Sequence, residues 1–291
     1  MAGRRTLWYV VNIKSRGIQT PQRYIEAFEH LDERDPLILL KGNRYISIES
    51  LQKSNYLEEN GGYPRALFLK LSAYEIVNPD AFYNRRSREN VSLQWDPDLT
   101  ANKKDVEIIF VPSVHRFAFK KSSPISLKPV LKYFSEALNE VEGEGSFDVD
   151  VVKSHDIIQR ILTSHEIFKV EADISYSNAD RSGGFRHLFD DKLRGVNAHR
   201  TKMSFEGSRY QPLQSGEDGM LEAVVGISES NGTVKAKIRE TANSKIQIIN
   251  TQNYPLNMEV NTTNREDVNT DVYNELKTRF DNNTEIQDEQ G

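Results

Sequence analysis

The stretch from Val106 to Val152 constrains the fold of this chain more than any other segment, because it combines strand and helix periodicity within a short length. Residues 106–111 and 116–120 are typical of two strands joined by a tight turn at 112–114. After Ser126, a suitable N-cap, apolar residues recur at helical spacing: Leu127, Val130, Leu131, Phe134, Leu138 and Val141. Residues 147–152, FDVDVV, alternate again as a strand. The order strand, strand, helix, strand indicates the α+β class.

The same pattern continues for one more helix and one more strand. Ser154 precedes a short apolar helix, and residues 168–175, FKVEADIS, alternate between apolar and charged side chains. The order β-β-α-β-α-β is that of a ferredoxin-like sandwich, in which helices cover one face of an antiparallel sheet. We therefore predict a ferredoxin-like α+β unit over residues 105–180.

The first hundred residues predict a second α+β unit. Residues 7–13 are typical of a buried strand, Pro21 suits the first turn of a helix, and Lys41-Gly42-Asn43 is a hairpin turn between two strand-like runs. Residues 65–74 complete the order β-α-β-β-β. We predict an N-terminal unit over residues 1–104, which ends in a long loop or boundary at 76–105 that carries Arg85-Arg86-Ser87-Arg88.

The remaining residues predict smaller elements. Residues 184–207 have a helical but poorly amphipathic pattern rich in Arg and Lys, and we expect a protruding basic helix there. A helical turn at 221–227, a hairpin at 230–250 and a final helix at 268–280 follow. The third unit thus spans residues 181–280, and residues 281–291 are expected to be a flexible tail. In total the sequence predicts an α+β protein with mixed or antiparallel sheets.

Several classes of chemistry are excluded or disfavoured by residue content. The chain has no cysteine, which excludes disulfides, thiol nucleophiles and thiolate metal sites. The six histidines form no HxH or HExxH pair, and the sequence has neither a GxSxG nucleophile turn nor a GxxxxGK[ST] phosphate loop. The apolar run near the N-terminus ends after Val11, which is too short for a signal peptide or a membrane span. We expect a soluble cytoplasmic protein without a cofactor.

A local concentration of positive charge is the main candidate binding feature. Residues 108–135 hold five Lys or Arg and no Asp or Glu, although the chain has a net charge of -5. Cations attract phosphate without regard to sequence, so these residues are predicted to bind nucleic acid or another anion. They are Arg116, Lys120, Lys121, Lys128 and Lys132. The alternation places Phe117 and Phe119 in the core instead of on a stacking surface.

Two alternatives remain open. Asp148, Asp150, Glu171 and Asp173 occur as i, i+2 pairs on two strands, and if the strands were adjacent the four carboxylates would suit a Mg²⁺-dependent nuclease. The other alternative is a protein-interaction module without nucleic-acid contact, in which the acidic segment 265–291 contacts a basic partner. No catalytic residue is assigned outside the nuclease alternative.

Four segments carry a resemblance to known proteins: FVPSVHRFAFKK, SLKPVLKYFSEAL, FDVDVVKSHDIIQRIL and FKVEADISYSNAD, in this order and spacing. They resemble a bacterial family found in prophages and defence islands, close to the Gop type of satellite-phage killer protein and more loosely similar to the RexA type of phage-exclusion protein. The resemblance implies a prophage- or satellite-phage-encoded protein that kills its bacterial host or excludes other phages. It further implies DNA as a target and restraint by an antidote protein from a neighbouring gene. It transfers no catalytic residue.

Overall fold

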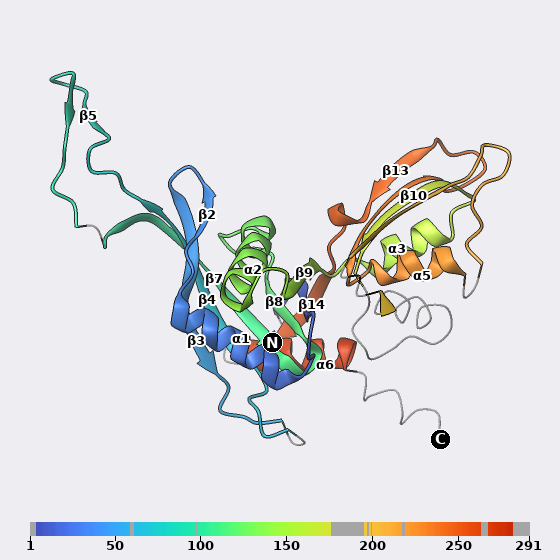
Figure 1. Ribbon diagram of the computed structural model, residues 1–291, viewed down its shortest axis with the longest axis horizontal. Helices are drawn as coiled ribbons and strands as arrows, with labels where there is room; N and C mark the ends of the chain where they lie inside the picture. The colour runs from blue at the N-terminus through green and yellow to red at the C-terminus, as the bar shows by residue number, and fades with distance from the viewer. Residues whose placement is uncertain are drawn as a thin grey trace.

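The computed structural model describes residues 4–58, 61–96, 98–175, 195–196, 198, 200–216, 219–262 and 267–281. Two antiparallel sheets form two lobes, and a long hairpin arm projects from the larger lobe (Figure 1). The larger sheet has eight strands in the order β14-β1-β8-β7-β4-β3-β2, with β9 also paired to β1. The smaller sheet has four strands in the order β11-β10-β12-β13.

The elements of the larger lobe are β1 (Arg4–Ser15), α1 (Pro21–Arg34), β2 (Ile38–Lys41), β3 (Arg44–Lys53), β4 (Leu67–Ile76), β7 (Thr100–Val111), the 3-10 turn η1 (Pro112–Val114), β8 (Arg116–Lys120), α2 (Leu127–Glu142), β9 (Phe147–Val151), β14 (Asn257–Thr262) and α6 (Val268–Phe280). Those of the smaller lobe are α3 (His155–Leu162), β10 (Glu166–Ile174), β11 (Thr201–Glu206), α5 (Met220–Ile227), β12 (Gly232–Arg239), β13 (Gln247–Asn250) and the 3-10 turn η2 (Thr251–Asn253). The arm carries the short strands β5 (Phe82–Asn84) and β6 (Glu89–Val91).

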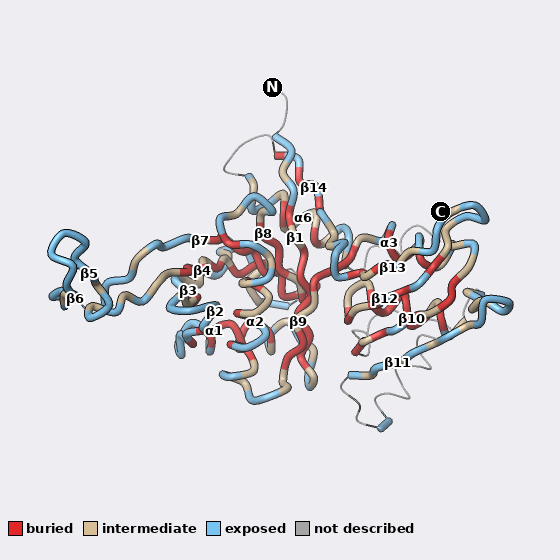
Figure 2. Tube along the Cα trace, turned by 90° about the horizontal axis from the view of Figure 1, so that it is seen from above, coloured by how far each residue is buried: buried red, intermediate tan, exposed pale blue. Residues whose placement is uncertain are grey.

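The larger sheet is covered on both faces. Helices α1 and α2 pack on one face, where Phe28, Phe117 and Phe134 are fully buried. Helix α6 packs on the opposite face, against Trp8 and other apolar side chains. The buried segments therefore run through the middle strands of this lobe (Figure 2). Because successive strand residues point to opposite faces, Phe117 and Phe119 enter the α1/α2 core while Ala118 enters the α6 core.

Among the described residues, helices cover one face of the smaller sheet. Helices α3 and α5 bury the apolar side chains of its strands, and the charged side chains of β10 and β12 lie on the other face. Gly232 starts β12 with φ +137, and a Cβ there would meet the carbonyl oxygen of Asp173. Only glycine therefore allows β12 to approach β10 at this point.

The α+β class with antiparallel sheets is confirmed, and so is the chain order of most elements. The final helix, the hairpin of β12 and β13, and the buried positions of Phe117 and Phe119 agree with the sequence pattern. The predicted boundary at 104/105 falls inside β7, which pairs with β4 on one side and β8 on the other. The strands predicted as one ferredoxin-like unit belong to two different sheets. Strands β8 and β9 pair with β1 in the larger sheet, whereas β10 pairs with β11 and β12 in the smaller sheet.

Two predicted irregular or helical segments differ in the structure. Residues 201–206, predicted as part of a basic helix over 184–207, form strand β11, because Met203 and Phe205 alternate with polar residues and pack toward the α3/α5 core. Residues 184–194, 197 and 199 of that predicted helix lie outside the described residues, as do residues 282–291 of the predicted tail. The predicted loop at 76–105 contains β5, β6 and the start of β7.

No helix in the described part of the chain has both the length and the apolar character required to cross a bilayer.

Candidate nucleic-acid interface

Two of the five predicted anion-binding residues, Arg116 and Lys120, support the packing of the sheet. The Arg116 guanidinium lies 4.1 Å from the ring centroid of Phe280 in α6, and its Nη1 donates a hydrogen bond of 2.7 Å to the carbonyl oxygen of Val114. The Lys120 ammonium lies 5.4 Å from the ring of Trp8. Through these cation–π contacts, both side chains pack against aromatic rings on the α6 face of the sheet.

The other three residues lie toward the opposite face of the sheet. The Lys121 ammonium lies 5.8 Å from the ring of Tyr9. Lys128 and Lys132 belong to α2, and the Lys132 amine donates a hydrogen bond of 2.6 Å to the carbonyl oxygen of Leu39. The eight-stranded sheet therefore separates the five cations into two groups, and they do not form a single surface.

A third group of cations occupies the tip of the arm. Strands β4 and β7 remain paired to Ile76 and Thr100, and the chain continues outward to the hairpin of β5 and β6 (Figure 1). Figure 2 shows that this arm is exposed along most of its length and extends well beyond the sheet. The turn between β5 and β6 holds Arg85, Arg86 and Arg88, and all three are exposed.

Local hydrogen bonds order the turn that presents these arginines. The Asn84 side-chain oxygen accepts hydrogen bonds from the backbone N–H groups of Arg86, at 2.9 Å, and Ser87, at 3.2 Å. The Arg88 N–H donates a further bond of 2.7 Å to the Asn84 carbonyl oxygen, and Arg88 adopts a left-handed backbone with φ 61. Asn commonly organises turns in this way. The three guanidinium groups form no ion pair with any residue that the structure describes.

Two acidic residues of the arm take part in its own turns. The Asp80 carboxylate accepts a hydrogen bond of 2.6 Å from the Ser92 hydroxyl, and the Asp96 carboxylate accepts one of 3.0 Å from the Asp98 N–H. Both residues flank the β5–β6 hairpin, in the part of the arm between the hairpin and the sheet. At the tip, the exposed Glu89 directly follows Arg88, so the three arginines leave a net positive charge there, next to the exposed ring of Tyr83.

The predicted nuclease residue Asp148 belongs to a partly buried ion pair. Its two carboxylate oxygens accept hydrogen bonds from Nε and Nη2 of Arg16, at 3.2 and 2.9 Å. Asp148 lies opposite Lys14 and Asp150 lies opposite Asn12 in the β1–β9 pairing. The acidic face of β9 thus meets a polar stretch of β1 instead of solvent.

Asp150 and Asp173 come together through Arg200, which the sequence pattern had placed in the basic helix. Arg200 Nη1 lies 3.9 Å from an Asp150 oxygen, and Arg200 Nε donates a hydrogen bond to Asp173. Burial raises the pKa of Asp150 despite the nearby cations Lys153 and Arg200. Burial also lowers the pKa of Lys153 to about 8, and its amine has no hydrogen-bond acceptor among the described residues.

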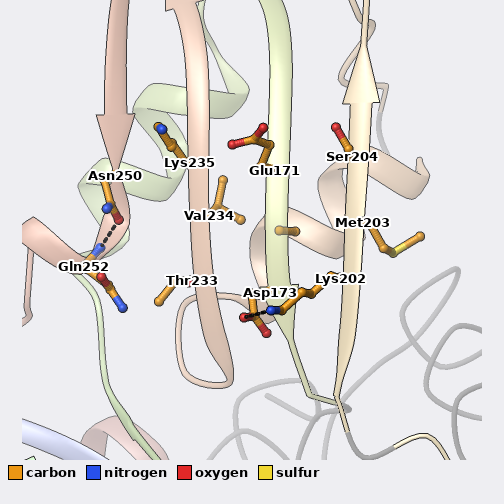
Figure 3. A pocket seen from close by; sticks show the side chains of 11 residues that line it. Glu171, Asp173, Lys202, Met203, Ser204, Thr233, Val234, Lys235, Asn250 and Gln252 are labelled. Atoms are coloured by element: carbon orange, nitrogen blue, oxygen red, sulfur yellow. Dashed lines mark hydrogen bonds and ion pairs between the residues drawn. The ribbon is translucent and has the colours of Figure 1, made fainter.

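Glu171 and Asp173 lie on the open face of the smaller sheet, where a shallow hollow of about 370 Å³ crosses the strands (Figure 3). Figure 3 shows Asp173 beside Lys202 of β11, and the two charges are 3.9 Å apart. Glu171 is paired with Lys169 at 2.9 Å. The hollow therefore carries charges of both signs that already neutralise each other.

The four predicted carboxylates do not gather into one cluster. Arg16 and Arg200 lie against Asp148 and Asp150, and Lys169 pairs with Glu171. Among the residues that the structure describes, no group of three or more His, Asp or Glu side chains is arranged to hold a metal ion.

The sequence indicated some of these features and missed others. The run of arginines at 85–88 was visible, but nothing local showed that β4 and β7 would carry it outward. No sequence pattern indicated that Arg200 contacts one acidic residue from each lobe, because the three residues are far apart in the chain.

A comparison with protein families gives one result. A family model described as "Domain of unknown function (DUF4747)" matches residues 4–278. No curated protein matches the chain. Because the family match covers nearly all described elements, from β1 to α6, this chain belongs to the DUF4747 family.

Proposed function

We propose that this protein binds DNA through the tip of its arm. The observation that carries the proposal is the exposed turn with Arg85, Arg86 and Arg88, presented at the end of a hairpin that projects from the sheet. Guanidinium groups bind phosphate in a bidentate manner and also enter narrow minor grooves. Slender β-ribbons are among the elements that proteins insert into a DNA groove.

We further propose that DNA binding serves host killing or phage exclusion in the bacterial cytoplasm. The support is the resemblance to the prophage and defence-island family, to the Gop type of killer protein and to the RexA type of exclusion protein. On this proposal the activity is restrained by an antidote protein from a neighbouring gene, and no cofactor takes part in binding.

The direct test removes the arm charges without removing the turn. We would measure binding of a fluorescent duplex by the wild type and by Arg85→Gln with Arg86→Gln and Arg88→Asn; Asn is chosen because it tolerates the left-handed backbone of residue 88. Loss of three phosphate contacts should weaken binding about tenfold or more and reduce the slope of log K against log salt by up to about 3.

A matched control separates the arm from a general change in net charge. Lys202→Gln with Lys237→Gln and Lys245→Gln removes three exposed cations elsewhere on the protein, none of them among the five predicted from the sequence. It should bind duplex nearly as tightly as the wild type. Equal binding by the arm variant and the wild type would exclude the arm as the contact.

The biological part of the proposal needs a test in cells. The gene would be induced in a bacterium alone and together with its genomic neighbours, while viability and phage plating are scored. We expect that wild-type protein kills or excludes only when the neighbours are absent, and that the arm variant loses this effect. Full activity of the arm variant would separate host killing from DNA binding.

The nuclease alternative is tested in the same binding reactions. Incubation of the duplex with Mg²⁺, with and without a chelator, reports cleavage directly. We expect intact DNA, because cations already contact Asp148 and Asp150. Cleavage that disappears in Asp150→Asn would instead support a metal-dependent nuclease.

A further inference from the structure

A hollow with only positively charged ionisable groups lies on the α1/α2 side of the larger sheet, between the β2–β3 hairpin and the start of α2. Its volume is about 340 Å³, at the small end of the range for sites that hold small molecules. Four cations contribute to the lining and no carboxylate does: Lys41, Arg44, Lys128 and Lys132. Lys128 and Lys132 are two of the five residues predicted from the sequence, and Lys41 and Arg44 join them only in the folded protein.

Most of these cations form no ion pair with a residue that the structure describes. Lys132 lies 3.7 Å from Glu136 and donates a hydrogen bond to the Leu39 carbonyl oxygen. Lys41, Arg44 and Lys128 form no ion pair with any described residue. The Nε atom of Arg44 is buried and has no hydrogen-bond partner among the described residues. A buried guanidinium N–H without an acceptor is costly, and an anion in the hollow would satisfy it.

The backbone adds a second source of positive potential. Ser126 precedes α2 with an extended backbone, at φ -77 and ψ 171, and its side chain makes no capping hydrogen bond. The first turn of α2 contains no acidic residue. The N–H groups of a helix start favour negative charge, and in α2, where Pro129 lacks one, they adjoin the four cations.

The lining of the hollow favours an organic phosphate. Leu40, Ala73, Ile125 and Pro129 supply an apolar part of its wall next to the charged groups. A phosphomonoester carries close to two negative charges and three acceptor oxygens at neutral pH, which suits several cations at one place. An apolar wall would contact the organic part of such a molecule.

We propose that this hollow binds the phosphomonoester group of a small ligand such as a nucleotide or a sugar phosphate. The hollow lies near the base of the arm, because Arg44 pairs with Glu75 close to the end of β4, whereas the three arm arginines lie beyond it at the tip (Figure 1). Bound phosphate would contact Arg44 from β3 and Lys128 from α2 together, and would therefore fix the β2–β3 hairpin against the helix.

The test uses the full-length protein with the three arm substitutions, so that DNA binding by the arm does not contribute. Calorimetric titration would compare inorganic phosphate, AMP and adenosine. A 5′-phosphorylated oligonucleotide and the same oligonucleotide with a 5′-hydroxyl would show whether the phosphate of a nucleic-acid end is also accepted. We expect saturable binding of phosphate and AMP and no binding of adenosine.

Two substitutions and one control assign the site. Arg44→Gln and Lys128→Gln should each weaken AMP binding about tenfold, the effect of one charge-assisted hydrogen bond. Lys245→Gln, which removes an exposed cation of the smaller lobe outside the hollow, should leave binding unchanged. Lys128 is exposed, so its substitution tests the site even if Arg44→Gln reduces stability. The proposal is overturned if none of the phosphomonoesters binds saturably, or if Lys128→Gln binds AMP as the wild type does.

Discussion

The charge state of His115 is determined by the residues that surround its side chain. It ends the η1 turn with a left-handed backbone at φ 56, and its ring stacks on Tyr24 with 4.4 Å between centroids. The side chain is buried, and this burial, with a smaller contribution from Arg116, lowers the pKa of His115 to about 4. The imidazole is therefore neutral at pH 7 and acts as a packing group.

This lowered pKa predicts a pH dependence of stability. The unfolded chain binds a proton at His115 near pH 6.5, whereas the folded protein does so only near pH 4. Between these values the unfolded state holds more protons, so the contribution of His115 to stability falls as the pH falls. The loss amounts to about 3 kcal/mol at most across this window. Urea midpoints at pH 7, 5.5 and 4 would measure it.

The comparison with a His115→Asn variant isolates this group. Asn tolerates the left-handed backbone and does not titrate, so the variant should lose less stability on acidification. The raised pKa of Asp150 acts in the opposite direction, because its protonated form is favoured in the folded state, and it is present in both proteins. Parallel pH curves for the two proteins would contradict the assignment.

At the scale of elements, the arm differs from every other part of the larger lobe. Its strands β5 and β6 pair only with each other, and no arm residue belongs to one of the three buried clusters. An isolated two-stranded hairpin is marginally stable, so the arm contributes little to the stability of the lobe.

We therefore predict that the arm can be removed without unfolding the protein. Deletion of residues 80–92, with two glycines joining Pro79 to Leu93, uses the existing hydrogen bond of 3.0 Å from the Leu93 N–H to the Pro79 carbonyl oxygen. The free energy of unfolding should change by less than about 1 kcal/mol, because no buried contact is lost. Denaturant titration measures this change, and duplex binding should fall as in the arm charge variant. A cooperative loss of folding would show that the arm is part of the core structure.

At the scale of the whole molecule, polar groups join the two lobes where α6 no longer covers β1. Trp8 and Val10 lie under α6, but Asn12 on the same face donates hydrogen bonds to the Asn231 side chain at 3.0 Å and the Ser230 carbonyl oxygen at 3.2 Å. The backbone N–H of Lys153 donates a hydrogen bond of 2.8 Å to the carbonyl oxygen of Glu229. Arg200 adds the link between Asp150 and Asp173.

Arg200 is predicted to stabilise this junction. Arg200→Gln leaves the buried Asp150 with one fewer cation and should lower the free energy of unfolding by about 1–2 kcal/mol, a value reduced for the partial exposure of Arg200. Lys202→Gln is the matched control, because Lys202 also contacts Asp173 but its side chain is 82% exposed. Its effect should be close to zero. Equal denaturant midpoints for the two variants would contradict a junction role for Arg200.

Local pattern was enough to predict most helices and strands. The helical spacing from Leu127 to Val141 and the alternation of Phe117 and Phe119 are produced by burial on one side, and burial leaves the same pattern wherever the partner element lies. Residues 201–206 form a strand because they pair with β10, whereas the helix prediction rested on the Lys and Arg content of the longer segment 184–207.

The sequence by itself determined the α+β class, the identity of the core aromatics and the presence of local groups of cations. Only the tertiary structure decided which charges meet. The larger sheet divides the five predicted cations, and Arg200 joins acids from both lobes. Lys41 and Arg44 of the β2–β3 hairpin line one hollow with Lys128 and Lys132 of α2. The physical reason is that periodicity reports one-sided burial along a segment. Electrostatic contacts depend on distances between segments, and strand pairing sets those distances.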